Sequence, residues 1–572
     1  MLIGATSITG RATARDAVAD GTAAGRAAGL AAGAVAAPDL YGALAAREIL
    51  KAGGNAVDAA VATGFALAVT YPEAGNLGGG GFMTLYMHGK PYFLDYRETA
   101  PAAASAGMYL DASGEPVTAL SVVGNLSTAV PGTVRGLAQA HRRFGRLSWR
   151  RDLAPAIRLA THGFLVTAQL IGMRDGERPS FRDATNFDRY FGAMVAGQRY
   201  RQPELAATLR RIAARGDREF YHGRTADLLL AQMQRGAVAG LVSRSDLAHY
   251  QAVWREPVAG TWHGYRLITA PPPSSGGIEL LQMLTMKQDA AALFQDVPLN
   301  SPQYLHLVSE IEKRVFADRA QYMGDPDFVT VPVRQLIDPA YLAARAAQID
   351  PMTPSPLAAV TPGLDAVTPA AETPAAEKPQ TTHFSILDRW GNAVSNTYTL
   401  NGWFGSGVVV EGAGFLLNDE MDDFSAKPGA PNQYGVVGAD ANAIAPFKRP
   451  LSSMTPTILL RDGRVAMVLG TPGGSRIFTS VFQVLVDVYD FGIQLQPALA
   501  QMRFHHQLLP ENTLFAEPYA PFPPDLARAL LERGYRLEAQ NYNGDIEAIE
   551  VIGREPIAAA DPRARGVAML VR

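Results

Sequence analysis

The stretch KPQTTHFSILDRWGNAVSNTYTLN, residues 378–401, decides how the rest of the chain is interpreted. Residues 381–388 and 393–400 are rich in Thr, Phe, Ile, Val and Tyr, and the intervening turn contains Gly and Asn. This pattern predicts a β-hairpin. The hairpin directly follows a segment dominated by Pro, Thr and Ala, residues 351–380, which predicts a disordered tether.

The register of the hairpin gathers short polar side chains at one strand end. If the strands are antiparallel and the turn is centred on Trp390 and Gly391, Thr381 lies across from Leu400. Thr381 is then within about one residue of Thr399 and Asn401. A threonine with polar partners thus begins a strand immediately after a segment that looks cleavable.

That position suits a threonine that becomes a nucleophile by becoming a chain terminus. An attack of the Thr381 hydroxyl on the Gln380 carbonyl, followed by hydrolysis of the ester, cuts the chain between these residues. The new α-amino group, with a pKa of about 8, can then act as the base for the hydroxyl. Taken alone, the hairpin favours an ordinary Thr-rich hairpin beside a linker, and the motifs in the rest of the chain reverse that preference.

Bulk composition is that of a globular protein without a polyanion-binding surface. The chain has 572 residues, 48% of them hydrophobic and 18% charged, with a net charge of −3. Length alone suggests about three to four domains. No domain has the excess of basic residues that would indicate nucleic-acid binding. The absence of cysteine excludes disulfides, thiolate metal sites and thiol nucleophiles.

The N-terminal region leaves export open. Residues 27–37 resemble the apolar part of a signal peptide, but Arg and Asp residues upstream make the preceding region long and mixed in charge. We expect residues 33–37 to form the first core strand instead, preceded by a mobile arm over residues 1–32. Helices are expected over residues 39–51 and 55–70, the second apolar on nearly all sides and therefore buried.

Two polar clusters have opposite charge. Arg97 stands at a strand end near the glycine-rich loop of residues 76–82, where a guanidinium can clamp a carboxylate with two hydrogen bonds. Residues 418–424 contain four carboxylates and suit an ammonium group. They lack the spacing and the glycine of a calcium-binding EF-hand loop, and a solvated acidic turn is the alternative.

Two further loops can bind anions. Ser452 and Ser453 follow a proline and offer paired hydroxyls, although they can also simply cap a turn. Gly473 and Gly474 lie in the loop of residues 471–476 between a predicted strand and helix, and adjacent glycine amides can form an oxyanion hole. A phosphate-binding loop is less consistent, because no Gly-Lys-Ser/Thr ending follows.

Together these motifs closely resemble the γ-glutamyltransferase (γ-glutamyltranspeptidase) family of N-terminal-nucleophile hydrolases. The resemblance runs from about Gly33 to Arg563, and the co-linear set is far more specific than any single member. The matching segments are residues 53–60, 76–83, 95–98, 271–277, 322–327, 381–383, 399–401, 418–425, 450–454, 471–476 and 503–506.

The resemblance implies a mixed α/β (α+β) fold, a four-layer αββα sandwich cut autocatalytically into two chains. A large chain (residues 33–380 after the arm) and a small catalytic chain (residues 381–572) form one compact heterodimer. Thr381 resembles the processing and catalytic nucleophile, and Thr399 its hydrogen-bonding partner. Gly473 and Gly474 resemble the oxyanion-hole donors. Three residues resemble those that bind the α-carboxylate of the γ-glutamyl donor: Arg97, Ser452 and Ser453. Three others resemble those that bind its α-ammonium group: Asn401, Glu420 and Asp423.

The family also implies the substrates. They are γ-glutamyl donors such as glutathione, with water, amino acids or dipeptides as acceptors, and no cofactor or metal. Residues 428–439 resemble the lid loop of lidded members, with Tyr434 at its closing position, which favours small donors. Asp419 stands where Asn is frequent, adding charge near the ammonium site. A periplasmic or secreted location is implied, with a cytoplasmic one still open.

Two rival functions share parts of this pattern. A cephalosporin (glutaryl) acylase has the same scaffold but accepts side chains without the α-amino group. An unprocessed, inactive γ-glutamyl-binding protein would keep the pocket without the chemistry. The intact acidic and Ser-Ser clusters argue against the first, and the intact nucleophile, partner and oxyanion loop argue against the second.

Overall fold

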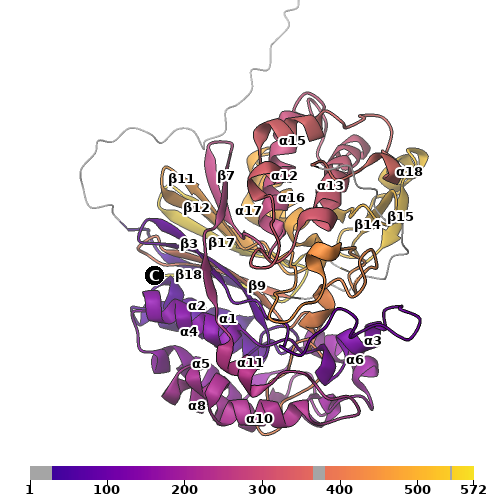
Figure 1. Ribbon diagram of the computed structural model, residues 1–572. Coiled ribbons are helices and arrows are strands. Elements are labelled where there is room, and N and C mark those ends of the chain that lie inside the picture. Colours follow the sequence, from indigo (N-terminus) through magenta and orange to yellow (C-terminus); the bar gives the residue numbers. More distant parts are fainter. Residues whose placement is uncertain (1–28, 365–380, 542–543) are drawn as a thin grey trace, which may run out of the picture.

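Two β-sheets packed face to face form the centre of the molecule, and helices cover the outer face of each sheet (Figure 1). This computed structural model describes residues 29–364, 381–541 and 544–572. The expected four-layer αββα sandwich is confirmed. Both sheets contain strands from before and from after Thr381, so the two segments share one core.

The first sheet is entirely antiparallel and has the predicted hairpin at its centre. In spatial order its strands are β18 (Val567–Val571), β1 (Gly33–Ala37), β9 (Thr382–Leu387), β10 (Ala393–Thr399), β2 (Gly80–Met87), β3 (Lys90–Asp95) and β6 (Val253–Arg255).

The second sheet faces the first across a thin apolar interface. Small residues of β1, such as Ala34 and Ala36, pack there against Ile458, Val468 and Ile549 of the second sheet. The strands of the second sheet, in spatial order, are β17 (Glu555–Ala560), β16 (Glu547–Ile552), β12 (Arg464–Gly470), β11 (Thr457–Arg461), β8 (Tyr265–Thr269) and β7 (Val258–Trp262).

One helix over the first sheet, α2 (Ala56–Thr70), begins at the cap that the sequence predicts. Asn55 accepts hydrogen bonds from the amides of Val57 and Asp58 at the start of the second helix, whose fifteen residues are all buried. This layer contains α1 (Leu40–Lys51), α2 (Ala56–Thr70), α4 (Thr133–Phe144), α5 (Trp149–His162), α6 (Ala168–Phe181), α7 (Phe187–Phe191), α8 (Pro203–Arg215), α9 (Arg218–His222), α10 (Arg224–Met233) and α11 (Arg244–His249).

The helices over the second sheet surround one long buried helix, α13. Several of its charged residues are paired inside the protein, for example Lys313 with Glu310 at 2.6 Å. The layer contains α12 (Gly276–Asp289), α13 (Pro302–Tyr322), α14 (Val333–Leu336), α15 (Pro339–Ala346), α16 (Ile477–Tyr489), α17 (Leu495–Leu499) and α18 (Pro524–Glu532). The short strands β13 (Phe504–His505), β14 (Thr513–Ala516) and β15 (Arg536–Ala539) form a small sheet beside it.

The tether is shorter than the sequence predicts. The prediction of disorder is wrong for residues 351–364, because Ser355 donates a hydrogen bond to Glu310 and the amide of Gly363 donates one to Asp318 at 2.9 Å. The remaining tether residues, 365–380, lie outside the described residues, as do residues 1–28 of the expected N-terminal arm.

The hairpin has nearly the predicted register. Ala393 pairs with Leu387 and Tyr398 pairs with Thr382, one residue from expectation. The ladder therefore leads to Thr381 and Thr399 at the same strand end. The strand expected at residues 33–37 is confirmed as β1. Within the described residues, no helix combines the length and apolar character needed to cross a bilayer.

Candidate active site

The hydroxyls of Thr381 and Thr399 face each other at the end of β9 and β10. Their Oγ1 atoms are 3.2 Å apart, and Thr399 Oγ1 also accepts a hydrogen bond from the amide of Asn401 at 2.8 Å. Both threonines are buried and both line one pocket. The structure thus brings together the three residues that the hairpin register predicts at this end.

The glycine-rich loop of residues 76–82 supports Thr399 from the neighbouring strand. Asn76 donates a hydrogen bond to the Thr399 carbonyl at 2.8 Å. A Cβ atom at Gly79 would lie 2.0 Å from that carbonyl, so only glycine fits here. This close backbone approach explains the glycine run and gives it a packing role beneath the site.

Acidic residues surround Arg97 at one side of the pocket. Its guanidinium forms short ion pairs with Glu420 and Asp423 and lies 3.8 Å from Glu98. Burial raises the pKa of each of these three carboxyls, and the guanidinium opposes that rise. Three carboxyl groups share one cation, so the side as a whole favours a further positive charge.

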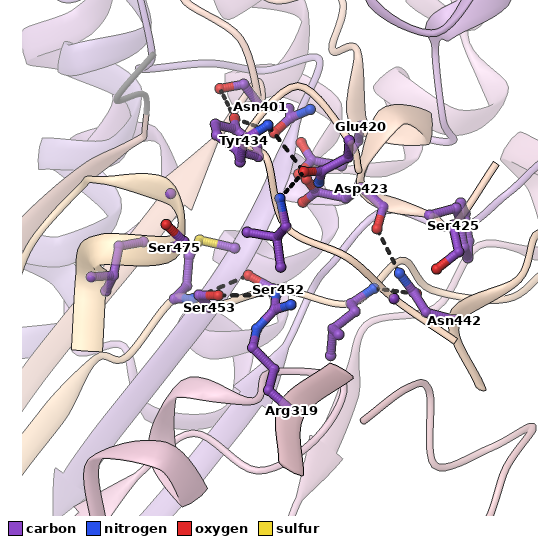
Figure 2. Close-up of a pocket in the computed structure, with 18 of the residues that line it drawn as sticks. Arg319, Asn401, Glu420, Asp423, Ser425, Tyr434, Asn442, Ser452, Ser453 and Ser475 are labelled. Carbon is purple, nitrogen blue, oxygen red and sulfur yellow. Dashed lines mark hydrogen bonds between the residues drawn. The ribbon is translucent and has the colours of Figure 1, made fainter. Parts of the chain in front are cut away.

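Hydroxyl groups and a second guanidinium occupy the opposite side. Figure 2 shows Ser452 and Ser453 there, with Arg319 reaching them from α13. Arg319 donates a hydrogen bond to Ser453 Oγ at 3.1 Å and lies 3.4 Å from Glu279. Arg319 could not be predicted from the sequence, because an arginine inside a helical pattern carries no signal that it faces a pocket.

The structure therefore separates two groups that the family resemblance joins. Arg97, expected beside Ser452 and Ser453, contacts the acids instead, although its Nη2 also donates to the Leu451 carbonyl at 3.1 Å. Arg97 thus lies at the boundary between the acidic side and the hydroxyl side.

The loop containing Gly473 and Gly474 begins directly after β12. Their φ values of 141° and 58° lie in the region that favours glycine. Among the described residues, neither amide nitrogen has a hydrogen-bond acceptor. Gly474 and its neighbour Ser475 line the pocket. The local backbone leaves two adjacent donors available, as an oxyanion hole requires.

Residues 428–439, the lid segment, cover the pocket. Tyr434 donates a hydrogen bond to Asn401 Oδ1 at 2.5 Å, and the two side chains lie together in Figure 2. The amide of Gln433 donates to Asp422 at 3.0 Å, and its side chain donates to Asp419 at 3.2 Å. Burial raises the pKa of Asp419 well above its usual range, which opposes the extra charge expected at this position.

A group of side chains with metal-ligating atoms lies outside the pocket. Within the described part of the chain, a metal-like grouping is formed by Asp58, His141 and Asp152, whose ligand atoms lie within 4.8 Å of one another. None of the three lines the pocket. Asp58 oxygens accept hydrogen bonds from the amides of Asn55 and Arg146, which gives Asp58 a capping role at α2.

An αββα sandwich with a threonine hydroxyl at the head of a central strand defines the class of N-terminal-nucleophile hydrolases. A family model described as Gamma-glutamyltranspeptidase matches residues 42–571. The chain belongs to the γ-glutamyltranspeptidase family.

Proteins similar to this chain include a glutathione hydrolase proenzyme, a γ-glutamyltranspeptidase and a cephalosporin acylase. The chain is 60% identical over 540 residues to the glutathione hydrolase proenzyme of Pseudomonas aeruginosa, covering 94% of each protein. It is 58% identical to the solved γ-glutamyltranspeptidase from Pseudomonas nitroreducens, with a TM-score of 0.58 over 59% of this chain and 100% of that chain. The solved cephalosporin acylase from Bacillus halodurans gives a TM-score of 0.79 at 27% identity, covering 97% and 98% of the two chains.

Asp422 provides a test of the electrostatics beneath the lid segment. Burial raises its pKa from 3.8 to about 6. Because the folded state has the higher pKa, the stability that this proton contributes is present below pH 4 and is lost as pH rises through 6. We expect the free energy of unfolding of Asp422→Asn, relative to wild type, to increase by about 2 kcal/mol between pH 4 and 7.

Urea unfolding across this pH range measures the effect. Asp111→Asn is the control, because the Asp111 carboxylate is exposed and hydrogen-bonded to Ser113. The free energy of unfolding of Asp111→Asn, relative to wild type, should not increase between pH 4 and 7. Parallel stability curves for wild type and Asp422→Asn would show that Asp422 titrates normally.

Proposed function

We propose that this protein is a γ-glutamyltransferase with glutathione hydrolase activity, in which Thr381 forms a γ-glutamyl ester. One observation carries the proposal. The Thr381 hydroxyl lies in a pocket with an acidic side and a hydroxyl-rich cationic side. An α-amino acid group has one positive and one negative charge, so such a pocket fits that end of a γ-glutamyl donor.

Maturation begins with the same hydroxyl. Thr381 attacks the Gln380 carbonyl carbon, its Oγ1–Cβ group becomes the alkoxy part of an ester, and water then splits that ester. The products are a carboxylate at Gln380 and a free amine at Thr381. Thr381 has a φ of 118°, which is strained for a β-branched residue and costs about 1–3 kcal/mol. Cleavage removes this constraint, which favours scission at this bond.

Donor binding uses the two sides of the pocket. Glu420, Asp423 and the Asn401 side chain hold the α-ammonium group. Ser452 and Ser453 donate hydrogen bonds to the α-carboxylate. The ammonium group replaces Arg97 beside the acids, and the Arg97 guanidinium turns toward the α-carboxylate. The position of Arg319 beside Ser453 supports its assignment as an additional cation for the carboxylate.

Acylation follows once the γ-carbonyl carbon lies against Thr381. The free α-amine accepts the hydroxyl proton, directly or through water, as Oγ1 attacks the carbon. The Gly473 and Gly474 amides stabilise the oxyanion, and removing one such donor typically costs about 3–4 kcal/mol of activation free energy. The leaving amine, cysteinylglycine in the case of glutathione, takes a proton as the amide bond breaks. Thr399 orients the nucleophile throughout.

Deacylation returns the enzyme to its starting state. Water, an amino acid or a dipeptide attacks the γ-glutamyl ester, and Thr381 leaves with a proton. Tyr434 and the rest of the lid segment retain small donors during this cycle. The large and small chains act as a heterodimer of one precursor, and the proposal includes a periplasmic or secreted location.

The identity of the nucleophile is tested by Thr381→Ala. We expect this variant to remain one 61.0 kDa chain on a denaturing gel and to lose γ-glutamyl hydrolysis, because one hydroxyl performs both steps. Thr382→Val is the matched control, since the neighbouring Thr382 Oγ1 is buried without a hydrogen-bond partner in the described structure. It should be processed and active. Cleavage after Gln380 in Thr381→Ala would rule out the shared nucleophile.

The choice of donor separates this function from the acylase alternative. A γ-glutamyl anilide and a glutaryl anilide differ only in the α-amino group, so a rate comparison isolates the contribution of the acidic side. We expect kcat/KM to favour the γ-glutamyl substrate by roughly 10³-fold or more, because buried carboxylates stay uncompensated with the glutaryl group. A preference for glutaryl anilide would support the acylase.

A further inference from the structure

A chain of buried hydrogen bonds joins the lid segment to the oxyanion loop through Gln507. The Gln507 side-chain nitrogen donates to the Tyr434 carbonyl at 3.3 Å. Its side-chain oxygen accepts a hydrogen bond from Ser475 Oγ at 2.7 Å. Gln507 follows β13, and it is distant in the sequence from the segments that hold the nucleophile and the charged sides of the pocket. One amide group therefore contacts two parts of the pocket wall that are distant in sequence.

His505 fixes the orientation of this amide. Its Nε2 lies 3.1 Å from Gln507 Oε1, and its Nδ1 lies 3.0 Å from Thr479 Oγ1. Burial lowers the pKa of His505 well below its usual range, so the ring is neutral and has one N–H. A proton on Nε2 lets the ring donate to Gln507 Oε1, with Ser475 Oγ also 3.3 Å from Nε2. Thr479 then shares its one hydroxyl proton between Nδ1 and the Arg476 carbonyl. The other tautomer would place two acceptors face to face.

The orientation of Gln507 has a direct consequence for both partners. With Oε1 accepting from His505 and Ser475, the amide N–H groups can only point away, toward Tyr434. Ser475 is adjacent to Gly474 and lines the pocket with it. Tyr434 is held at its other end by Asn401. The closed lid segment and the conformation of the oxyanion loop are thus stabilised by the same side chain.

We propose that Gln507 is a positioning residue that couples closure of the lid segment to the geometry of the oxyanion loop. Its donor half holds Tyr434 in the closed position, and its acceptor half holds Ser475 next to Gly474. The inference rests on the proposed function for its kinetic consequences. A residue that only filled space would affect neither the lid segment nor the ratio of kcat to KM selectively.

Gln507→Met tests the coupling, because methionine has a similar length and lacks both the donor and the acceptor. Hydrogen–deuterium exchange of residues 430–438 should become roughly tenfold faster, the effect expected from losing one hydrogen bond. Measured per processed active site on a γ-glutamyl anilide, KM should rise and kcat should fall, each by roughly three- to tenfold. Gln496→Met is the control, because exposed Gln496 donates to the Ala560 carbonyl away from the pocket.

Gln507→Glu separates the two halves of the amide. At pH 9 its carboxylate keeps the acceptors for Ser475 and His505 but cannot donate to Tyr434. Exchange of the lid segment should be as fast as in Gln507→Met, whereas kcat should stay closer to wild type. If Gln507→Met yields no processed enzyme, Gln507→Glu alone decides the question.

Wild-type exchange of residues 430–438 in folded Gln507 variants would overturn the coupling. A kcat for Gln507→Glu as low as that of Gln507→Met would overturn the separate role of the acceptor half. The wild-type enzyme is assayed in parallel. Absence of γ-glutamyl turnover in wild type would contradict the proposed function, whereas the exchange measurement would still test the contact between Gln507 and the lid segment.

Discussion

The antiparallel pairing of β9 with β10 is the constraint on which the site depends. It places Thr381 against Thr399, and the next pairing places Thr399 against Gly80 of the glycine-rich loop. Both strands are central and buried on both faces. A shift of one residue would turn their side chains to the opposite faces, so the register is strongly specified. The backbone ladder, more than any side chain, therefore positions the nucleophile.

Charge separation across the pocket determines which donors bind. Acids gather around Arg97 on one side, and Ser453 and Arg319 lie on the other. Arg97 partly neutralises the acids, so an incoming ammonium group competes with an internal cation. The donor's ammonium group can replace the Arg97 guanidinium as the buried cation beside the acids. A donor without the amine provides no such cation, so α-amino donors are selected.

Features with local signals could be predicted from the sequence, and those created by long-range contacts could not. The Asn55 cap and the hairpin follow from a few neighbouring residues; the cap is confirmed, and the register differs from the predicted one by one residue. The tether was predicted too long because Ser355 reaches a buried acid of α13, a contact that composition does not reveal. Arg319 and Gln507 were missed for the same reason, since each lies in a segment whose pattern indicates only core packing.

The most direct test of the central claim is N-terminal sequencing of the small chain from purified, active enzyme. Chain scission that activates its own side-chain oxygen predicts a fragment whose first residue is Thr381, followed by Thr382 and His383. Active material that consists of one uncut chain, or a small fragment that begins at another residue, would contradict the account.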